Sequence, residues 1–271
     1  MPSSKHTRTA LERKAPPAPS GARGLARVTP ASDPAMRAPR PMLHAVRSRS
    51  QRTVFGTELR MTTTFPDISI NTDRLVLRPY EEADIPAFVE MMNDELVTAW
   101  TSVPHPYTRA HAEDWVRRIA PAERTEGRGI VFAVTEFLTQ RLVGTVHLHD
   151  TDWHVRATEV AYVTAPWARG EGYATESVLA TARWLFGDRG FERLQLRTAA
   201  DNTASQQVAQ KIGCISEGVL RNAWIARSLT ESGEWTDIRT DLIVWGLLPE
   251  DLDGLADQMA EAGYSSYTDW S

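Results

Sequence analysis

Between residues 67 and 249 the hydrophobic positions follow two different periods. Apolar residues at every second position are typical of a strand with one buried face, and spacings of three and four are typical of a helix with one buried stripe. The first pattern predicts strands over 68–78, 130–135, 142–149, 159–164, 194–198, 215–223 and 236–245. The second predicts helices that begin at Asp84 and Thr108, and further helices over 172–186 and 203–212.

Cap and breaker residues support several of these boundaries. Pro79 is expected to stop the first strand, because proline cannot donate to a sheet. Asp84 and Thr108 are expected helix caps, Pro121 is expected to end the second helix, and Gly213 is expected at the position after the last one. The resulting order is β-α-α-β-β-β-α-β-α-β-β, which indicates a mixed sheet flanked by helices, an α/β or α+β fold.

Charge divides the chain unevenly. Residues 1–60 contain 12 Lys/Arg and 3 Asp/Glu, a net +9, whereas the rest contains 18 and 32, a net −14. Eight of the 16 prolines lie in the first 60 residues and none of the nine tryptophans does. This composition predicts a disordered basic extension over 1–66, a folded domain over 67–249 and an acidic tail over 250–271.

The basic extension is open to three interpretations. It is an untranslated leader if translation starts at Met61. It is an organelle-targeting peptide if its high arginine and low acidic content act as a targeting signal. Alternatively, it is an arm that contacts RNA or the ribosome through phosphates. It has no apolar segment of the secretory type.

Cysteine content and hydropathy exclude several classes. Cys214 is the only cysteine, so an intramolecular disulfide framework and a cysteine-rich zinc site are excluded. A reducing compartment, the cytoplasm, fits best. No apolar run approaches the roughly 20 residues that span a bilayer, so we expect no membrane segment.

Candidate chemistry is concentrated where the strand over 159–164 meets the next helix. The segment Pro166–Ala174 contains two glycines separated by one residue. Glycines let backbone N–H groups approach a ligand closely, and a helix N-terminus adds unpaired donors and partial positive charge. Such a loop predicts a phosphate cradle, to which Arg169 adds a cation in an otherwise acidic domain.

Other interpretations of this loop remain open. A dinucleotide fold expects a third small residue where Thr175 stands, and it places the loop after the first strand. An ordinary tight turn needs no ligand at all. Downstream, Asn202 and Ser205 are either a helix cap and its neighbour, or two polar groups that point into a cleft between strands.

Three motifs follow one another in the order found in the GNAT superfamily of acyl-CoA N-acyltransferases, which residues 68–248 resemble: Arg169-x-x-Gly172-x-Ala174, Asn202-x-x-Ser205, and Lys211-x-Gly213 followed by Glu217-Gly218. The similarity is strongest to its RimJ/RimL branch, the ribosomal-protein N-terminal alanine acetyltransferases and their small-molecule relatives. The resemblance implies a mostly antiparallel sheet of about seven strands with about four helices.

The resemblance also implies acetyl-CoA as cosubstrate, with no metal. Its diphosphate is expected on Arg169, Gly170, Glu171, Gly172, Tyr173, Ala174 and Thr175. Its pantetheine is expected along Tyr162, Val163 and Thr164, with a hydrogen bond to Asn202. Ser205 is expected to stabilise the departing thiolate as a hydrogen-bond donor.

The general base is less well defined, because Trp224 stands where the RimL-type pattern has a glutamate. We expect Glu159 to take this role, with His147, His149 and Asp150 as rivals. Positioning of an already neutral amine is a further alternative that needs no strong base.

Tryptophans and tyrosines suggest where the acceptor binds. The candidates are Trp100, Tyr107, Trp224 and Trp235, although such residues also fill cores. We expect acetyl transfer to a primary amine in a ternary complex. The amine belongs to a protein N-terminus or a small molecule, and the enzyme is a monomer or homodimer. The alternative is a non-catalytic acyl-CoA-binding module.

Overall fold

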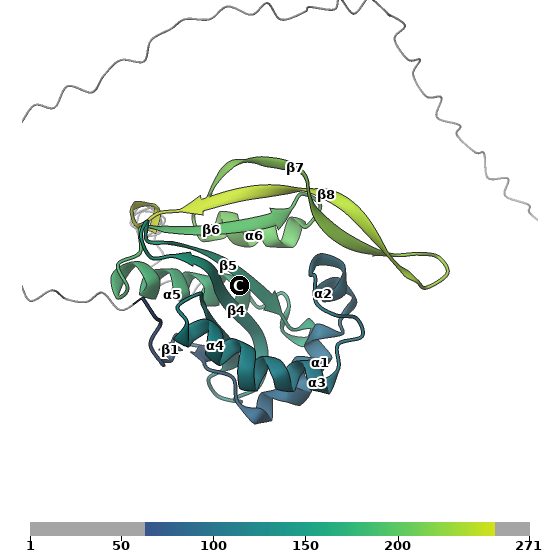
Figure 1. Ribbon diagram of the computed structural model, residues 1–271, viewed down its shortest axis with the longest axis horizontal. Coiled ribbons are helices and arrows are strands. Elements are labelled where there is room, and N and C mark those ends of the chain that lie inside the picture. The colour runs from purple at the N-terminus through teal and green to yellow at the C-terminus, as the bar shows by residue number, and fades with distance from the viewer. Residues whose placement is uncertain (1–62, 253–271) are drawn as a thin grey trace, which may run out of the picture. The chain divides into compact units, whose positions relative to one another are not determined.

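The computed structural model describes residues 63–252, which form an eight-stranded sheet in the order β1-β2-β3-β4-β5-β6-β8-β7 (Figure 1). All neighbouring strands are antiparallel except β5 and β6, which are parallel. The strands are β1 (Ile70–Asn71), β2 (Leu75–Arg78), β3 (Ile130–Glu136), β4 (Leu142–Asp152), β5 (Ala157–Thr164), β6 (Arg193–Ala199), β7 (Ile215–Leu229) and β8 (Trp235–Leu247).

Helices cover both faces of the sheet. The helices are α1 (Ile85–Met92), α2 (Glu95–Trp100), α3 (Arg109–Asp114), α4 (Ala120–Thr125), α5 (Tyr173–Gly187) and α6 (Thr203–Lys211). The long helix α5 packs on β4 and β5, and α6 packs on β6, on one face. On the other face α1 packs on β4 and α4 on β3, while α2 lies against β7. Within residues 63–252, none of the helices combines the length and the hydropathy that a membrane span needs.

The sheet opens between β5 and β6. These strands pair only through Ala157–Glu159 and Arg193–Gln195. Beyond that point β5 continues to Thr164 beside β4, whereas β6 continues to Ala199 beside β8. The β6-facing edge of Val160–Thr164 is therefore left without a strand neighbour, which provides a gap in the middle of the sheet.

The core forms where helix stripes meet strand faces. Val178, Ala182 and Leu185 of α5 have no exposed surface, because their spacing of three and four residues places them on the stripe that faces the sheet. Phe65, within the predicted extension, is also buried and packs against Trp153 with ring centroids 4.9 Å apart. The ordered fold therefore includes residues before 67.

The first predicted strand is divided into β1 and β2. The predicted alternation is confirmed, since Leu75 and Leu77 are buried while Val76 and Arg78 are half-buried. However, Thr72 Oγ1 accepts a hydrogen bond from Leu75 N at 2.9 Å and turns the chain there. A side chain that binds its own backbone competes with the sheet ladder, so a short hairpin replaces one strand.

The first helical region also differs from expectation. Asp84 does not cap α1 with its side chain. Its buried carboxylate instead receives Arg78 Nη1 at 2.8 Å and Glu81 N at 2.8 Å. A short helix, α2, was not predicted; Asp94 caps it by accepting from Leu96 N and Val97 N.

The predicted end of the second helix at Pro121 is wrong. Thr108 caps α3 as expected, by accepting from His111 N at 3.3 Å. The helix then continues through a π-helical segment, Trp115–Ile119, into α4. Pro121 follows directly on this segment, in which Ala120 N donates to Trp115 O five residues earlier, so the altered hydrogen-bond pattern accommodates a residue without an N–H group inside a continuous helix.

The remaining predicted elements are confirmed with small changes of boundary. The strands β7 and β8 are longer than predicted and form an extended hairpin that reaches past α2 (Figure 1). Gly213 has φ +90° after α6, as its predicted position requires. The disordered extension and the acidic tail were predicted for segments that lie almost wholly outside residues 63–252.

Candidate active site

A cavity of about 670 Å³ occupies the gap between β5 and β6. Its walls come from both faces of the sheet, because side chains of β4, β5, α2 and β7 line it together with the start of α6. The lining includes His149, Glu159, Trp100, Trp224, Asn202 and Ser205. The opening of the sheet therefore connects the α6 side of the molecule to the α2 side.

Strand register gathers ionisable side chains on one wall. His149 lies directly opposite Glu159 in the antiparallel β4–β5 pair, and Glu159 lies opposite Gln195 in the short β5–β6 pair. Side chains opposite each other or two residues apart share a face of the sheet. His147 and Arg197 therefore lie on this face as well.

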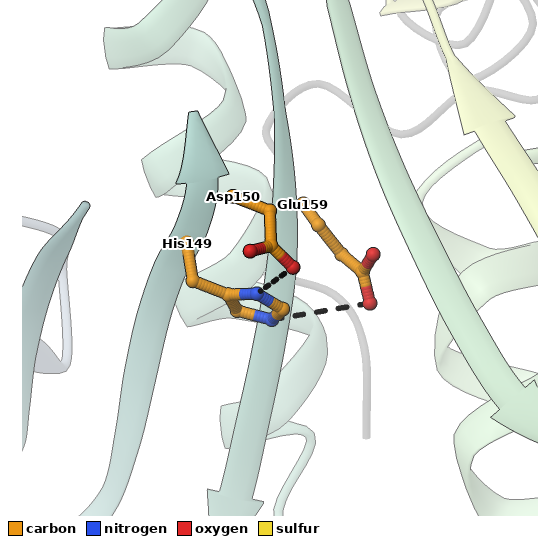
Figure 2. Close-up of side chains that lie close together, drawn as sticks. All are labelled: His149, Asp150 and Glu159. Atoms are coloured by element: carbon orange, nitrogen blue, oxygen red, sulfur yellow. Dashed lines mark hydrogen bonds and ion pairs between the residues drawn. The ribbon is translucent and has the colours of Figure 1, made fainter. Parts of the chain in front are cut away.

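Glu159 is the centre of this group and only 11 % of its side chain is exposed. Its Oε1 accepts from Arg197 Nε at 2.7 Å, and its Oε2 accepts from Gln195 Nε2 at 3.3 Å. His149 Nε2 lies 3.9 Å from Oε1, beyond hydrogen-bonding distance (Figure 2). The carboxylate is therefore held in place by β6 and has one side open towards His149.

His149 is fixed from its other side by Asp150. The distance between His149 Nδ1 and Asp150 Oδ2 is 3.0 Å (Figure 2). A β-bulge follows His149, and Asp150 has φ +51°. Adjacent residues of a regular strand point to opposite faces, so the bulge and the left-handed conformation bring the carboxylate back to the imidazole.

The side chains of His149, Asp150 and Glu159 lie close enough together to bind a cation. One ligand atom from each of His149, Asp150 and Glu159 lies within 4.8 Å of the others. However, Arg197 Nε donates to the Glu159 oxygen that faces His149. A guanidinium at this position opposes a divalent ion, so the donor set fits a singly charged group better.

His147 is the most enclosed of these groups. Its Nε2 is buried without a hydrogen-bond partner within residues 63–252, and its ring meets that of Trp115 edge-on at 5.6 Å. Burial lowers the pKa of His147 to about 4, and the neighbouring His149 acts in the same direction. His147 is therefore neutral near pH 7.

The glycine loop opens α5 as predicted. Gly170 and Gly172 have φ of +86° and +76°, a conformation that costs other residues energy. The helical hydrogen bonds begin with Glu176 N donating to Gly172 O at 3.1 Å. The N–H groups of Tyr173, Ala174 and Thr175 therefore have no acceptor within the helix, which fits an anion.

The side chain of Arg169 is already paired. Its guanidinium donates to both carboxylate oxygens of Asp94, at 3.3 Å to Oδ2 and more closely to Oδ1. Burial opposes ionisation of Asp94, but Arg169 and the N–H groups of Val97 and Leu96 outweigh it and lower its pKa. The predicted cation is thus neutralised locally and joins the loop to α2.

Side chains of the loop and of β5 point in several directions. Glu171 is exposed, Thr175 is buried, and Tyr173 turns away to donate its hydroxyl to Glu136 Oε1 at 2.9 Å. Val163 faces the cavity, while Thr164 and Ala174 line a small recess between β5 and α5. Any phosphate contact of these loop residues therefore relies on backbone groups.

Asn202 and Ser205 take part in the helix cap and also line the cavity, so both alternatives considered from the sequence apply. Asn202 Oδ1 accepts from Ser205 N at 3.1 Å and so caps α6, and both residues also line the cavity. Tyr162 reaches across and donates its hydroxyl to the backbone carbonyl of Ser205 at 3.3 Å. Burial raises the pKa of Tyr162 to about 12, although hydrogen bonding to Ser205 opposes this.

The aromatic candidates separate into two groups. Trp100 and Trp224 line the cavity. Tyr107 is instead buried at the base of α3, where its ring meets Phe88 at 5.6 Å, and Trp235 packs against His105 at 5.8 Å. Neither of these two lines the cavity. Cys214 is half-buried outside the lining, and burial raises its thiol pKa to about 12, which opposes nucleophilic reactivity.

Four contributors were missed by the sequence analysis. Arg197 and Gln195 anchor Glu159, and their alternation on β6 was the available signal. Asp94 precedes an apolar pair, which is a helix-start pattern. Trp115 was assigned only to a helix stripe, because no local pattern shows that it lines a cavity.

The sequence of this chain is similar to known acetyltransferase sequences. A family profile described as an acetyltransferase (GNAT) domain matches residues 74–215. The uncharacterized N-acetyltransferase YoaA of Bacillus subtilis is 28 % identical over 152 residues, which are 56 % of this chain and 85 % of YoaA.

Solved structures show the same fold. Mycobacterium smegmatis RimJ in complex with CoA-disulfide has a TM-score of 0.60 and 19 % identity, over 73 % of this chain and 96 % of RimJ. Spermidine N-acetyltransferase from Vibrio cholerae, in complex with CoA and spermine, has a TM-score of 0.56 and 18 % identity, over 67 % and 99 %.

Proposed function

Since this chain belongs to the GNAT acetyltransferase family, we propose that it transfers an acetyl group from acetyl-CoA to a primary amine by direct attack in a ternary complex. The observation that carries the proposal is the opened sheet. The cavity between β5 and β6 places the start of α6 on one side and the His149–Glu159 wall on the other. A thioester and an amine can meet there without crossing a strand.

The coenzyme side fits acetyl-CoA through backbone groups. The unpaired N–H groups at the start of α5 and the two glycines with positive φ suit a diphosphate. The open edge of Tyr162, Val163 and Thr164 suits an extended pantetheine arm, which adds to a sheet as a strand does. Bound acetyl-CoA supplies an activated acyl thioester.

We assign the polar residues of the cavity to acetyl transfer. Ser205, at the start of α6, donates a hydrogen bond to the departing thiolate. Asn202 holds that helix start and contributes a contact to pantetheine. Glu159 faces the acceptor and promotes loss of its proton. General acid–base help of this kind contributes about 10²- to 10⁴-fold.

The acceptor is a protein N-terminal amine or a small amine. Trp100 and Trp224 provide the apolar part of its site. The Vibrio cholerae neighbour is named as a spermidine N-acetyltransferase, and another solved structure of this fold is named as RimL, a ribosomal L7/L12 alpha-N-protein acetyltransferase, so both types occur on this fold. The excess of acidic residues outside positions 1–60 suits a cationic acceptor.

The test is a product screen. Purified protein is incubated with isotopically labelled acetyl-CoA and a mixed library of peptides and small amines, and modified products are identified by mass. We expect a labelled N-acetyl product that depends on protein and grows with time. CoA binding by calorimetry without any product from the library would instead favour a non-catalytic acyl-CoA-binding module.

Several features stay predictions. These are a cytoplasmic location, a monomeric or homodimeric state, independence of metal, and contact of residues 1–60 with nucleic acid or the ribosome. The product screen with and without residues 1–60 addresses the last of these. If that segment recruits a ribosomal substrate, its removal lowers the yield from ribosomal peptides in a salt-dependent manner.

A further inference from the structure

The wall formed by β4 and β5 brings His149 and Asp150 beside Glu159, and acetyl transfer as proposed above assigns a role only to Glu159. His149 Nδ1 faces Asp150 Oδ2 at 3.0 Å, while His149 Nε2 faces Glu159 Oε1 at 3.9 Å. One imidazole thus lies between two carboxylates, with a hydrogen bond on one side and a gap on the other (Figure 2). The space between His149 Nε2 and Glu159 Oε1 is lined by two hydrogen-bond acceptors and therefore suits a donor group.

The hydrogen bond to Asp150 determines the tautomer of His149. A carboxylate without a proton can only accept, so His149 Nδ1 carries the hydrogen and Nε2 has a free lone pair. Thr158 Oγ1 donates to His149 O at 2.9 Å and contacts Thr151 Oγ1 at 2.9 Å, which braces the bulge that positions Asp150. The lone pair of Nε2 therefore points along a fixed direction.

The gap accommodates one nitrogen atom. A donor nitrogen about 2.9 Å from each acceptor can bridge atoms up to about 5.8 Å apart, and the two atoms here are 3.9 Å apart. A primary ammonium has the three N–H groups needed to donate to both atoms and to one further acceptor. Its single charge also suits the local balance of Asp150, Glu159 and Arg197.

We propose that His149 Nε2 and Glu159 Oε1 together bind the ammonium group of the acceptor, and that His149 then removes its proton. This inference rests on the proposed function and makes His149 the base, with Asp150 as a positioning residue. Glu159, anchored by Arg197 and Gln195, binds the ammonium and does not need to be the final proton acceptor.

The protons balance in this scheme. The ammonium gives one proton to His149 Nε2, and the imidazolium formed is stabilised by Asp150, whose side chain is 75 % exposed. The imidazolium then releases one proton to water and returns to its neutral form. The neutral nitrogen forms the C–N bond as the C–S bond breaks. Its next proton goes to the thiolate near Ser205, so that the products are amide, CoA thiol and one proton released to water.

Groups around His149 are compatible with this role. From β4 it faces Asp150 and His147, from β5 Glu159, and from β6 Arg197 lies behind Glu159. His147 does not compete for the proton, because burial keeps its pKa at about 4. The more distant Glu123 and Arg128 of the cavity pair with each other at 3.1 Å.

The first experiment tests the site without turnover. Long-range ¹H–¹⁵N spectra of the histidine-labelled full chain report the tautomer of each imidazole, with His149→Gln to assign the signal. We expect His149 to carry its hydrogen on Nδ1, and methylammonium chloride to shift its Nε2 signal in the wild type but not in Glu159→Gln. A hydrogen on Nε2, or no shift with methylammonium, would overturn the proposal.

The second experiment compares ethylamine with 2,2,2-trifluoroethylamine, a similar-sized amine that is largely unprotonated at neutral pH. For His149→Gln we expect kcat/KM to fall about 10²-fold with ethylamine but less than about 3-fold with the fluorinated amine. Asp150→Asn should shift the acidic limb of the pH profile, where the base takes up a proton, whereas His154→Gln, at an exposed turn, should change nothing.

The outcomes separate the two proposals. Equal losses for both amines would assign His149 a structural role and overturn the inference. Loss of activity on chelation, restored by Zn²⁺, would assign these atoms to a metal and also overturn it. If the wild type acetylates no amine while methylammonium still shifts His149, then the ammonium site stands and the proposed transferase function fails.

Discussion

The ion pair between Arg169 and Asp94 allows the role of the loop to be tested by a single substitution. Asp94→Asn keeps an oxygen that can accept from Leu96 N and Val97 N, so the cap of α2 is retained. It removes only the charge that pairs with Arg169. Because both side chains are partly exposed, at 35 % and 16 %, we expect the free energy of unfolding to fall by about 0.2–1 kcal/mol.

Coenzyme binding should change in the opposite direction. In the wild type, Asp94 neutralises the cation of the loop and also repels a diphosphate. A unit charge about 6 Å from a phosphate contributes about 0.7 kcal/mol in water and more in a partly buried site. We therefore expect Asp94→Asn to bind CoA about 3- to 10-fold more tightly at low salt, with a smaller gain at high salt.

Calorimetric titration with CoA at two salt concentrations measures this effect. Glu95→Gln is the matched control, because it removes one exposed carboxylate from the next position on α2. Arg169→Ala should weaken binding, and in that background Asp94→Asn should keep only the part of the gain that comes from direct repulsion of the diphosphate by Asp94. Unchanged or weaker CoA binding by Asp94→Asn would refute the view that the Arg169 guanidinium faces the diphosphate.

Acid unfolding provides a second measurement on the same pair. The pKa of Asp94 is lowered in the folded state, so the carboxylate adds stability above its unfolded pKa of about 3.9 and this contribution disappears as pH falls through the lower folded value. Wild type should therefore lose more stability than Asp94→Asn below about pH 4. Urea unfolding at pH 7 and pH 3 compares the two.

Three further predictions concern single positions. Gly172→Ala should destabilise the fold by about 1–2 kcal/mol because φ is +76°, whereas Gly187→Ala, at an open helical site, should stabilise it by about 0.4–1 kcal/mol in thermal unfolding. Thr198→Val should cost about 1–3 kcal/mol, measured by urea unfolding, because Trp245 Nε1 loses its buried acceptor at 2.9 Å. Ser205→Ala should lower kcat about 10²-fold with little change in CoA affinity, measured by thiol release and calorimetry; a wild-type rate would remove the role assigned to Ser205.

Features set by a few neighbouring residues could be predicted from the sequence. The glycine loop is one case, since Gly170 and Gly172 adopt the positive φ that their residue type allows. The cap of α6 by Asn202 is another, because the side chain binds a backbone group three residues away. In both cases the interacting groups lie within one helical turn of each other in the chain.

Pairings between distant segments could not be predicted in the same way. Arg197 anchors Glu159 across 38 residues, and Asp94 reaches Arg169 across 75. In both pairs, the sequence around one residue gives no sign of its partner, because strand register and helix packing bring the two residues together. The π-helical segment before Pro121 was also missed, since surrounding contacts decide how a chain accommodates proline.

The chemistry of the site arises where the sheet departs from regularity. If β5 and β6 paired along their whole length, no cavity would separate Ser205 from Glu159. If β4 continued without a bulge, Asp150 would point to the face opposite His149, and the tautomer of the imidazole would not be fixed. Alternation of apolar and polar residues identifies the strands in the sequence. It does not show where a strand contains a bulge, because a bulge depends on pairing with the neighbouring strand. The residues with the most specific assigned roles are therefore the ones whose placement needed the three-dimensional structure.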